Sequence, residues 1–230
     1  MKVVAVIVAG GVGRRLKTKV HKPFVRLSGR PLLARTLEAF EKTAGVNGIV
    51  LVIHPNDEQA ARRLIRSSGF RKIIQIVHGG ATRMASVSCG LKAVPSETQW
   101  VAVHDGARPL VTPKLIEATI RAAKRFKAAI AAVPVVPTVK QAAGGWVTKT
   151  LDRKILWAVQ TPQVFERRLL ERAHRLGGRN GIAATDDAAL VEGLGHRVRI
   201  VLGSHRNIKV TAPEDLIIAQ ALLKAEKIRT

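Results

Sequence analysis

The sequence predicts a three-layer α/β fold, in which helices cover both faces of a mostly parallel β-sheet. Two observations support this prediction: short apolar runs without polar alternation, and amphipathic segments of helical period between them. A strand that is apolar on both sides is typical of a sheet buried between two helical layers. A third observation, a stretch with prolines and a central glycine pair, predicts a hairpin that protrudes from this fold.

The apolar runs are interpreted as fully buried strands because they are short and rich in β-branched residues. They are VVAVIV (3–8), GIVLVI (48–53), KIIQIV (72–77), WVAVHD (100–105) and AAIAAVPV (128–135). Because helical segments separate them, the expected connections are βαβ units with parallel pairing.

The helical segments carry apolar residues at a spacing of three to four and have recognisable ends. They cover residues 30–43, 56–69, 112–126 and 211–227. Asn56 is expected to cap the second helix, and Gly69 to end it. Thr112 is expected to cap the third, whereas Thr211 and Glu214 have the spacing of a capping box at the start of the fourth.

Residues 133–157 interrupt this alternation. They contain prolines at 134 and 137, an AAGG turn, and a β-rich run on each side. The pattern predicts a hairpin arm over about 134–157, inserted into one domain that spans residues 1–230. Since an isolated hairpin cannot bury both of its faces, we expect the arm to pack on a second copy of the chain, as a dimerisation arm.

The charge balance is strongly basic. The formal net charge is +23, and the first acidic residue is Glu38. Such a charge attracts phosphate-bearing partners, which include nucleotides, sugar phosphates and nucleic acid. Aromatic residues make up only 3% of the chain and tyrosine is absent, which disfavours a protein that stacks single-stranded bases.

Composition also bears on location. No apolar run approaches the length of a membrane span, so no membrane partner is expected. The opening stretch resembles a signal peptide in its apolar part but lacks a small-residue cleavage site. Cys89 is the single cysteine, which excludes an intramolecular disulfide and fits a reducing compartment. We therefore expect a cytoplasmic protein.

A glycine-rich loop, AGGVGRRLKTKVHK (9–22), follows the first strand. It does not match the Walker pattern, because arginine follows Gly13 where lysine is required, nor the dinucleotide pattern, because Leu16 stands where the third glycine is required. What remains is open glycine backbone followed by Arg15 and Lys22. Backbone N–H groups and cations together are suited to a triphosphate.

This loop, with LSGRPLL (27–33), resembles the opening signature of sugar-phosphate nucleotidyltransferases. Later stretches resemble, in the same order, those of the 2-C-methyl-D-erythritol 4-phosphate cytidylyltransferases. They are GGATRMASVSCGL (79–91), VHDGARP (103–109), LDRKILWAVQTPQVF (151–165), TDDAAL (185–190) and NIKVTAPEDL (207–216). The resemblance thus spans nearly the whole chain.

The resemblance implies a Rossmann-like nucleotidyltransferase fold, Mg²⁺ as cofactor and a homodimer formed through the arm. It implies condensation of CTP with 2-C-methyl-D-erythritol 4-phosphate to give 4-CDP-2-C-methyl-D-erythritol and pyrophosphate, in non-mevalonate isoprenoid biosynthesis. Two alternatives stay open. One is a relative that acts on ribitol 5-phosphate, and the other is a basic nucleic-acid-binding protein on the same fold.

Site residues follow from the same resemblance. The catalytic cations would be Arg15 and Lys22, and the nucleotide would contact Ala9, Gly10, Gly11, Gly80 and Ser86. The acceptor would be bound by Asp105, Arg153, Thr161, Thr185 and Lys209. Arg153 would reach the acceptor phosphate of the neighbouring subunit. Asp105 would also be the metal ligand, with the ion held largely by phosphates. Arg83 is expected only to cap or support its helix.

Overall fold

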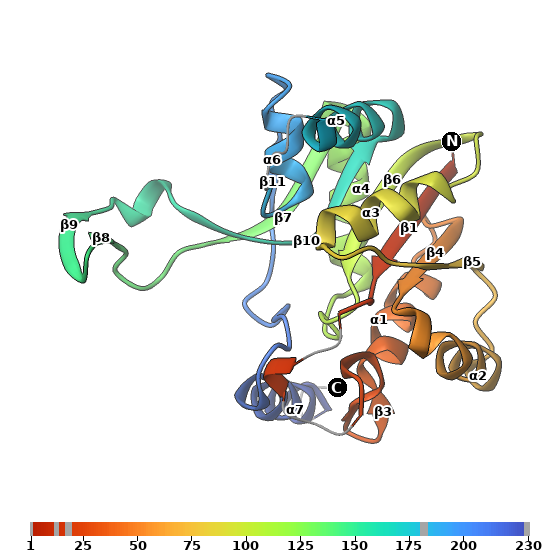
Figure 1. Ribbon diagram of the computed structural model, residues 1–230. Helices are drawn as coiled ribbons and strands as arrows, with labels where there is room; N and C mark the ends of the chain where they lie inside the picture. Colours follow the sequence, from red (N-terminus) through yellow and green to blue (C-terminus); the bar gives the residue numbers. More distant parts are fainter. Residues whose placement is uncertain (1, 12–13, 17–19, 180–183, 228–230) are drawn as a thin grey trace.

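The computed structural model describes residues 2–11, 14–16, 20–179 and 184–227. Its centre is a seven-stranded sheet with the order β11-β7-β10-β6-β1-β4-β5 (Figure 1). The strands are β1 (Lys2–Val8), β4 (Gly48–Ile53), β5 (Ile73–His78), β6 (Thr98–Asp105), β7 (Ala128–Pro134), β10 (Trp157–Glu166) and β11 (Arg199–Leu202). All pairs are parallel except those of β10, which runs antiparallel to β6 and β7. The predicted mostly parallel sheet is confirmed.

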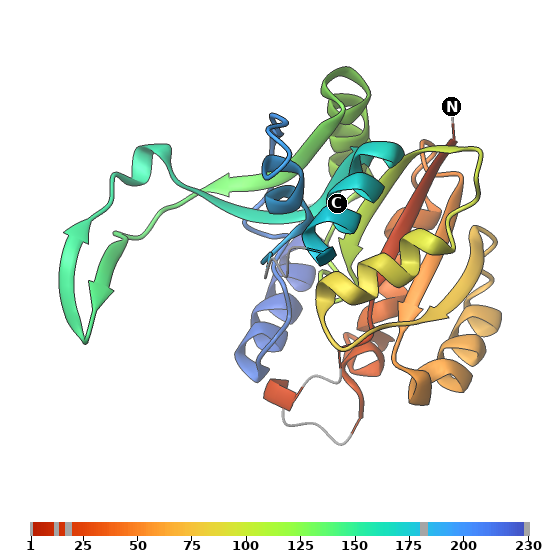
Figure 2. The same ribbon diagram turned by 45° about the horizontal axis from the view of Figure 1, so that its top comes forward.

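Helices cover both faces of this sheet, which confirms the three layers (Figure 2). They are α1 (Leu32–Glu41), α2 (Glu58–Ser68), α3 (Arg83–Lys92), α4 (Pro113–Phe126), α5 (Arg167–Arg179) and α6 (Asp187–Glu192), whereas a further helix, α7 (Pro213–Lys227), lies beside the sheet. Successive side chains of β1 point to opposite faces of the sheet and belong to two separate hydrophobic clusters. Val3, Ala5 and Ile7 pack with α1, α2 and α4, whereas Val4 and Val6 pack with α3, α5 and α6. No helix in the described ranges is long and apolar enough to cross a membrane.

A third, smaller core lies beside the sheet. There α7 packs on the short strands β2 (Arg26–Leu27) and β3 (Arg30–Pro31). Leu27 and Val210 are both completely buried in this cluster. It joins the chain after the glycine-rich loop to the C-terminal part, and so brings Lys209 to the loop side of the domain.

Two expectations about strands were wrong. β5 is not fully buried, since Ile74 is 48% exposed, because this strand forms one edge of the sheet. The second concerns β10, which the apolar runs did not predict. This strand carries Gln160 and Gln163, both buried, and their amides are satisfied by hydrogen bonds to Ser204 and Asp186. Polar residues of this kind hide a buried strand from a search for apolar runs.

The helix ends agree with the sequence in part. Thr112 caps α4 and Gly69 ends α2 with a positive φ of 67°, as predicted. Asn56 does not cap α2: its backbone N–H donates to His54 Nδ1, and the helix begins only after a short 3-10 turn. At the start of α7, Thr211 was expected to form a capping box with Glu214, and this prediction was also wrong.

The partner of Thr211 is Asp215 rather than Glu214. The backbone N–H and the hydroxyl of Thr211 both donate to Asp215 Oδ2, each at 2.7 Å. The N–H of Ala212 donates to the same oxygen at 2.9 Å. One carboxylate therefore satisfies the donors at the beginning of this helix.

The predicted arm is confirmed as a hairpin that extends away from the sheet (Figure 1). β8 (Lys140–Ala143) and β9 (Trp146–Thr150) pair with each other and turn at Gly144 and Gly145. Both glycines have positive φ, 55° and 84°, which favours glycine at these positions. Every residue of the two strands is exposed, and Trp146 is 80% exposed.

Candidate active site

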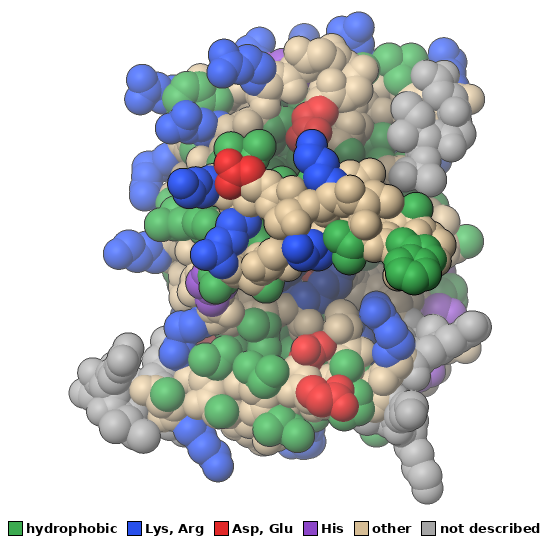
Figure 3. Space-filling model, turned by 90° about the vertical axis from the view of Figure 1, so that its left-hand side faces the viewer, with side chains coloured by type: hydrophobic (Ala, Val, Ile, Leu, Met, Phe, Trp, Pro, Cys, Tyr) green, Lys and Arg blue, Asp and Glu red, His purple; other side chains and the backbone are tan. Residues whose placement is uncertain are grey.

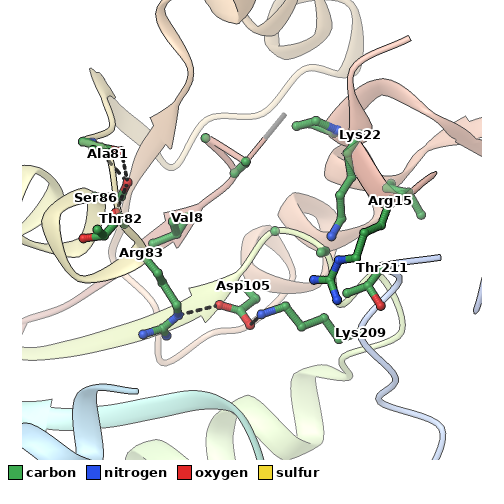
Figure 4. Close-up of a pocket in the computed structure, with 18 residues that line it drawn as sticks. Val8, Arg15, Lys22, Ala81, Thr82, Arg83, Ser86, Asp105, Lys209 and Thr211 are labelled. Atoms are coloured by element: carbon green, nitrogen blue, oxygen red, sulfur yellow. Dashed lines mark hydrogen bonds and ion pairs between the residues drawn. The ribbon is translucent and has the colours of Figure 1, made fainter. Parts of the chain in front are cut away.

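A cavity of about 380 Å³ opens at the carboxyl ends of β1 and β6 (Figure 4). In an open α/β sheet this edge is where ligands bind. The glycine-rich loop, the start of α3 and the end of β6 surround it. Nine of the residues predicted for the site line it: Ala9, Gly10, Gly11, Arg15, Lys22, Gly80, Ser86, Asp105 and Lys209.

The glycine-rich loop presents bare backbone to the cavity. The N–H of Ala9 donates to Val52 O at 2.7 Å, which continues the parallel pairing beyond β1. A Cβ on Gly10 would lie 3.3 Å from the carbonyl carbon of Ile53, so the loop packs closely on the end of β4. A Cβ on Gly11 would meet nothing within 4 Å. This side of the loop is therefore open to a ligand.

Four cationic side chains line the cavity: Arg15 and Lys22 from the glycine-rich loop, Arg83 from the start of α3, and Lys209 from the chain before α7. In Figure 4 the side chains of Arg15 and Lys22 lie close to each other. Burial, together with the positive charges of Lys209 and Arg15, lowers the pKa of Lys22 from 10.5 to about 8, against the opposing effect of Asp105 and Asp215. The surroundings of Lys22 in the fold thus disfavour its charge. Phosphate groups would reverse that balance.

Asp105 is the carboxylate of the cavity, and it is buried. Arg83 Nε donates to its Oδ1 at 3.0 Å, and Lys209 Nζ lies 2.7 Å from its Oδ2. Arg108 Nε is more distant, 3.9 Å from Oδ2. Burial alone would raise the pKa of Asp105, but the positive charges of Arg83 and Lys209 hold it well below the usual range. Asp105 is therefore ionised at neutral pH.

Arg83 does more than support its helix. Its Nη1 lies 2.9 Å from Oδ2 of Asp187, a residue only 1% exposed at the start of α6. The other oxygen of Asp187 is 2.9 Å from His174 Nε2, and His174 Nδ1 is 3.0 Å from Ser88 Oγ. Burial alone would lower the pKa of Arg83, but Asp187 and Asp105 raise it, so the guanidinium stays charged between two carboxylates.

Sequence reasoning missed this role of Asp187. The motif TDDAAL contributed to the family resemblance, and in the structure Asp186 caps α6 by accepting a hydrogen bond from the N–H of Ala189 at 3.0 Å. One aspartate is enough for a cap. The second, adjacent aspartate was therefore a signal for a partner elsewhere, but nothing in the motif identified Arg83 as that partner.

The start of α3 forms another wall of the cavity. The N–H of Gly80 donates to Ser86 Oγ at 3.1 Å, and Ser86 Oγ lies 2.9 Å from the carbonyl oxygen of Thr82. A Cβ on Gly80 would lie 2.6 Å from that of Ala85, so only glycine fits there. Ser86 thus fixes the backbone of this wall.

Three predicted residues do not line the cavity. Thr161 is buried behind Asp105: its hydroxyl accepts the N–H of Asp105 at 3.1 Å and lies 3.0 Å from His104 Nδ1. Burial lowers the pKa of His104 to about 3, so this imidazole is neutral. Arg153 lies on the arm, where its Nη1 donates to a backbone carbonyl, and Thr185 is exposed before α6.

The described residues contain no group of three or more His, Cys, Asp or Glu that could hold a metal ion. Among the described residues that line the cavity, Asp105 is the only carboxylate. One carboxylate fits a magnesium ion whose other ligands are phosphate oxygens and water. It does not fit a site built from protein ligands alone.

The sequence profile of the 2-C-methyl-D-erythritol 4-phosphate cytidylyltransferase family matches residues 3–225. The chain belongs to this family. A cytidylyltransferase of that name from Desulforamulus reducens is 48% identical over 224 residues, which are 96% of each chain. One from Pelotomaculum thermopropionicum is 46% identical and covers 99% of this chain and 97% of its own.

Solved structures of the family give the same result. The 4-diphosphocytidyl-2C-methyl-D-erythritol synthase of Anaerococcus prevotii is 31% identical, with a TM-score of 0.88 over 97% of this chain and 96% of that one. The cytidylyltransferase of Thermus thermophilus is 34% identical, with a TM-score of 0.80 over 95% and 98%. The predicted family, fold and enzyme class, a nucleotidyltransferase, are confirmed.

Proposed function

We propose that the chain transfers the cytidylyl group of CTP to 2-C-methyl-D-erythritol 4-phosphate. A phosphate oxygen of the acceptor attacks the α-phosphorus of CTP, and the bond from that phosphorus to the oxygen bridging to the β-phosphate breaks. The products are 4-CDP-2-C-methyl-D-erythritol, as a step of non-mevalonate isoprenoid biosynthesis, and pyrophosphate. The observation that carries this proposal is the convergence of Arg15, Lys22 and Lys209 on one cavity beside open glycine backbone.

The protein contributes position and charge in this reaction. The acceptor phosphate is itself the nucleophile, so no side chain has to form a covalent intermediate. Two polyanions must meet, and fixed cations lower the repulsion and stabilise the charge of the transition state. Arg15 and Lys22 lie beside the glycine-rich loop, where the triphosphate would bind. Lys22 becomes fully charged as the phosphates enter, because their charge opposes the lowering of its pKa.

Asp105 and Lys209 would serve the acceptor. Their ion pair of 2.7 Å keeps both side chains at the end of β6. When the acceptor binds, Lys209 can turn to its phosphate, and Arg83 keeps Asp105 ionised. A magnesium ion bound to the triphosphate would take Asp105 as its one protein carboxylate, and it would neutralise phosphate charge there.

A second copy of the chain would complete the site. Arg153 lies on the arm and does not line the cavity of its own chain. Exposed apolar side chains accompany it on the arm, among them Trp146, Val147 and Ile155. Figure 3 shows the face from which the arm projects, where Lys and Arg side chains are spread widely and acidic ones are few. We propose that the arm forms a homodimer and that Arg153 binds the acceptor phosphate in the partner's cavity.

Pyrophosphate release with a panel of nucleotides and acceptors tests the proposal. Turnover is expected with CTP, magnesium and 2-C-methyl-D-erythritol 4-phosphate, and not when another nucleotide replaces CTP. Preference for ribitol 5-phosphate would correct the acceptor alone. Absence of turnover with both acceptors would overturn the proposal. The cytoplasmic location expected from the sequence stays a prediction.

A further inference from the structure

The histidine directly before Lys22 contacts a buried carboxylate from a different part of the chain. His21 Nδ1 lies 2.6 Å from Oδ1 of Asp57. Asp57 is 4% exposed and ends the 3-10 turn Pro55–Asp57 that follows β4. Its Oδ2 is buried and has no hydrogen-bond partner in the described part of the chain. Among the described residues, His21 is thus the partner that this carboxylate has, and a buried carboxylate needs one.

The same end of β4 supports the glycine-rich loop. The backbone of Ile53 and His54 packs against Gly10, since a Cβ there would lie 3.3 Å from Ile53 C and 3.5 Å from His54 N. The ring of His54 meets that of His21 edge-on, with 6.1 Å between the centroids. Two parts of the site, the loop and the residue before Lys22, therefore rest on one fixed segment.

The position of His21 limits where Lys22 can lie, because the two residues are adjacent and His21 accepts the first hydrogen bond of the turn that Lys22 begins. The 3-10 turn Lys22–Phe24 begins with a hydrogen bond of 2.9 Å from the N–H of Phe24 to His21 O. The N–H of Val25 donates to Lys22 O at 3.2 Å. A movement of the His21 backbone would therefore move the backbone of Lys22, and with it the ammonium group in the cavity.

We infer that the contact between His21 and Asp57 positions Lys22 for the triphosphate, by fixing the turn that carries it. Neither residue lines the cavity, so both act through Lys22 and not on the substrate. They are positioning residues. The inference rests on the proposed role of Lys22 as a ligand of the triphosphate.

The charges around Lys22 make the inference testable. The charged groups that act on its pKa are Lys209, Asp105, Arg15 and Asp215, and Asp57 is not one of them. Removing the charge of Asp57 therefore leaves the pKa of Lys22 at about 8 as long as the turn stays in place. If the turn loosens, Lys22 gains water and its pKa rises toward the ordinary value of 10.5.

The experiment is calorimetric titration of the full chain with CTP and magnesium between pH 7 and 10. In the unchanged protein the affinity falls above about pH 8, as free Lys22 loses its proton. In Asp57→Asn the Kd at pH 7 is expected to rise about tenfold, because the turn is no longer fixed. The pH at which the affinity begins to fall is expected to move upward. Loss of stability alone would not move it.

A neighbouring pair provides the matched control. His78 Nε2 lies 2.8 Å from Glu58 Oε2, also a histidine and a carboxylate, but this pair is exposed and contacts no residue of the Lys22 turn. Glu58→Gln is expected to leave both the Kd and its pH dependence unchanged. His21→Gln is the second test of the pair, and it decides the matter if Asp57→Asn does not fold.

Lys22→Ala distinguishes a failure of the proposed function from a failure of this inference. Unchanged CTP affinity in Lys22→Ala would overturn the role of Lys22 in the proposed function. Weaker affinity in Lys22→Ala, together with the parent's Kd and pH dependence in folded Asp57→Asn or His21→Gln, would overturn this inference alone.

Discussion

Asp187 Oδ2 lies 2.9 Å from Nη1 of Arg83 and forms the far end of an ion-pair chain that begins in the cavity. Through this contact one guanidinium joins two carboxylates, that of Asp105 in the site and that of Asp187 at the start of α6. Because Asp187 is only 1% exposed, water cannot take the place of Arg83 there. The orientation of Asp105 therefore depends on a residue that does not line the cavity.

Asp187→Asn should lower both stability and turnover. The amide cannot replace the charge, so the free energy of unfolding is expected to fall by about 1–3 kcal/mol. Arg83 would then be free to turn into the cavity or to pair with Asp105 alone. We expect kcat to fall about tenfold while CTP affinity is kept or increased, because the cavity becomes more positive. Thermal unfolding and steady-state kinetics measure the two effects.

Glu171→Gln is the control for this change. It removes a carboxylate of α5 that accepts a hydrogen bond of 2.6 Å from Arg167, with no link to the cavity. Turnover should stay at the parent level. A variant Asp187→Asn that loses stability but keeps its kcat would show that the contact with Arg83 is structural only.

Replacing Lys22 should stabilise the empty protein while it abolishes function. The pKa of Lys22 falls from 10.5 in the unfolded chain to about 8 in the fold, mainly because of burial. Between these pH values the unfolded chain binds more protons, so the contribution of Lys22 to stability rises with pH. Lys22→Met removes this charge. Its stability gain over the parent should be full below pH 8 and disappear by about pH 10.5.

Denaturant unfolding across this pH range measures the gain, and turnover of the same samples measures the loss. Lys92→Met is a suitable control, because Lys92 is exposed at the end of α3 and does not line the cavity. If the stability difference between Lys22→Met and the parent did not change with pH, the gain in stability could not come from removing the charge of the Lys22 ammonium group.

Two adjacent glycines should respond differently to the same methyl group. In Gly10→Ala the new Cβ would lie 3.3 Å from backbone of Ile53, so a loss of about 1–2 kcal/mol in stability is expected. In Gly11→Ala the Cβ meets nothing within 4 Å, so stability should be kept. The methyl group would instead stand where the nucleotide approaches, and the Kd for CTP should rise about tenfold.

Melting temperatures and CTP titrations of the two variants test this contrast. Equal losses of stability would mean that the loop is packed on both sides. Unchanged CTP affinity in Gly11→Ala would mean that the nucleotide does not approach this part of the loop.

The proposed dimer predicts complementation between two inactive variants. Lys22→Ala lacks its own cation, and Arg153→Ala lacks the one that it would provide to its partner. In a mixed dimer one site is missing both groups and the other is intact. After subunit exchange at equal amounts, about a quarter of the parent activity should return, since half of the dimers carry one intact site. Mixtures that stay inactive after verified exchange would place Arg153 outside the partner's site.

The sequence was most informative where one strand or one loop determines the structure by itself. β1 and β4 are continuous apolar runs, and the glycine-rich loop directly follows the first of them. Asp105, which the family resemblance assigned to the site, ends a buried strand at the binding edge of the sheet. In each case local pattern and tertiary structure agree.

Contacts between distant segments could not be predicted in this way. His21 and Asp57 are 36 positions apart, the first in the glycine-rich loop and the second in a predicted helix, and no local pattern indicated that they contact each other. Arg83 and Asp187 present the same difficulty. Thr161 illustrates a related difficulty, because a motif shows that a residue belongs to the site region but not which way its hydroxyl points.

The arm has a consequence for how the protein behaves at low concentration. β8 and β9 pair only with each other, and Trp146 is 80% exposed within a single chain. If Arg153 works in a neighbouring molecule, specific activity would fall on dilution as subunits separate, and it would return on reconcentration. The specific activity of such a protein would depend on its own concentration.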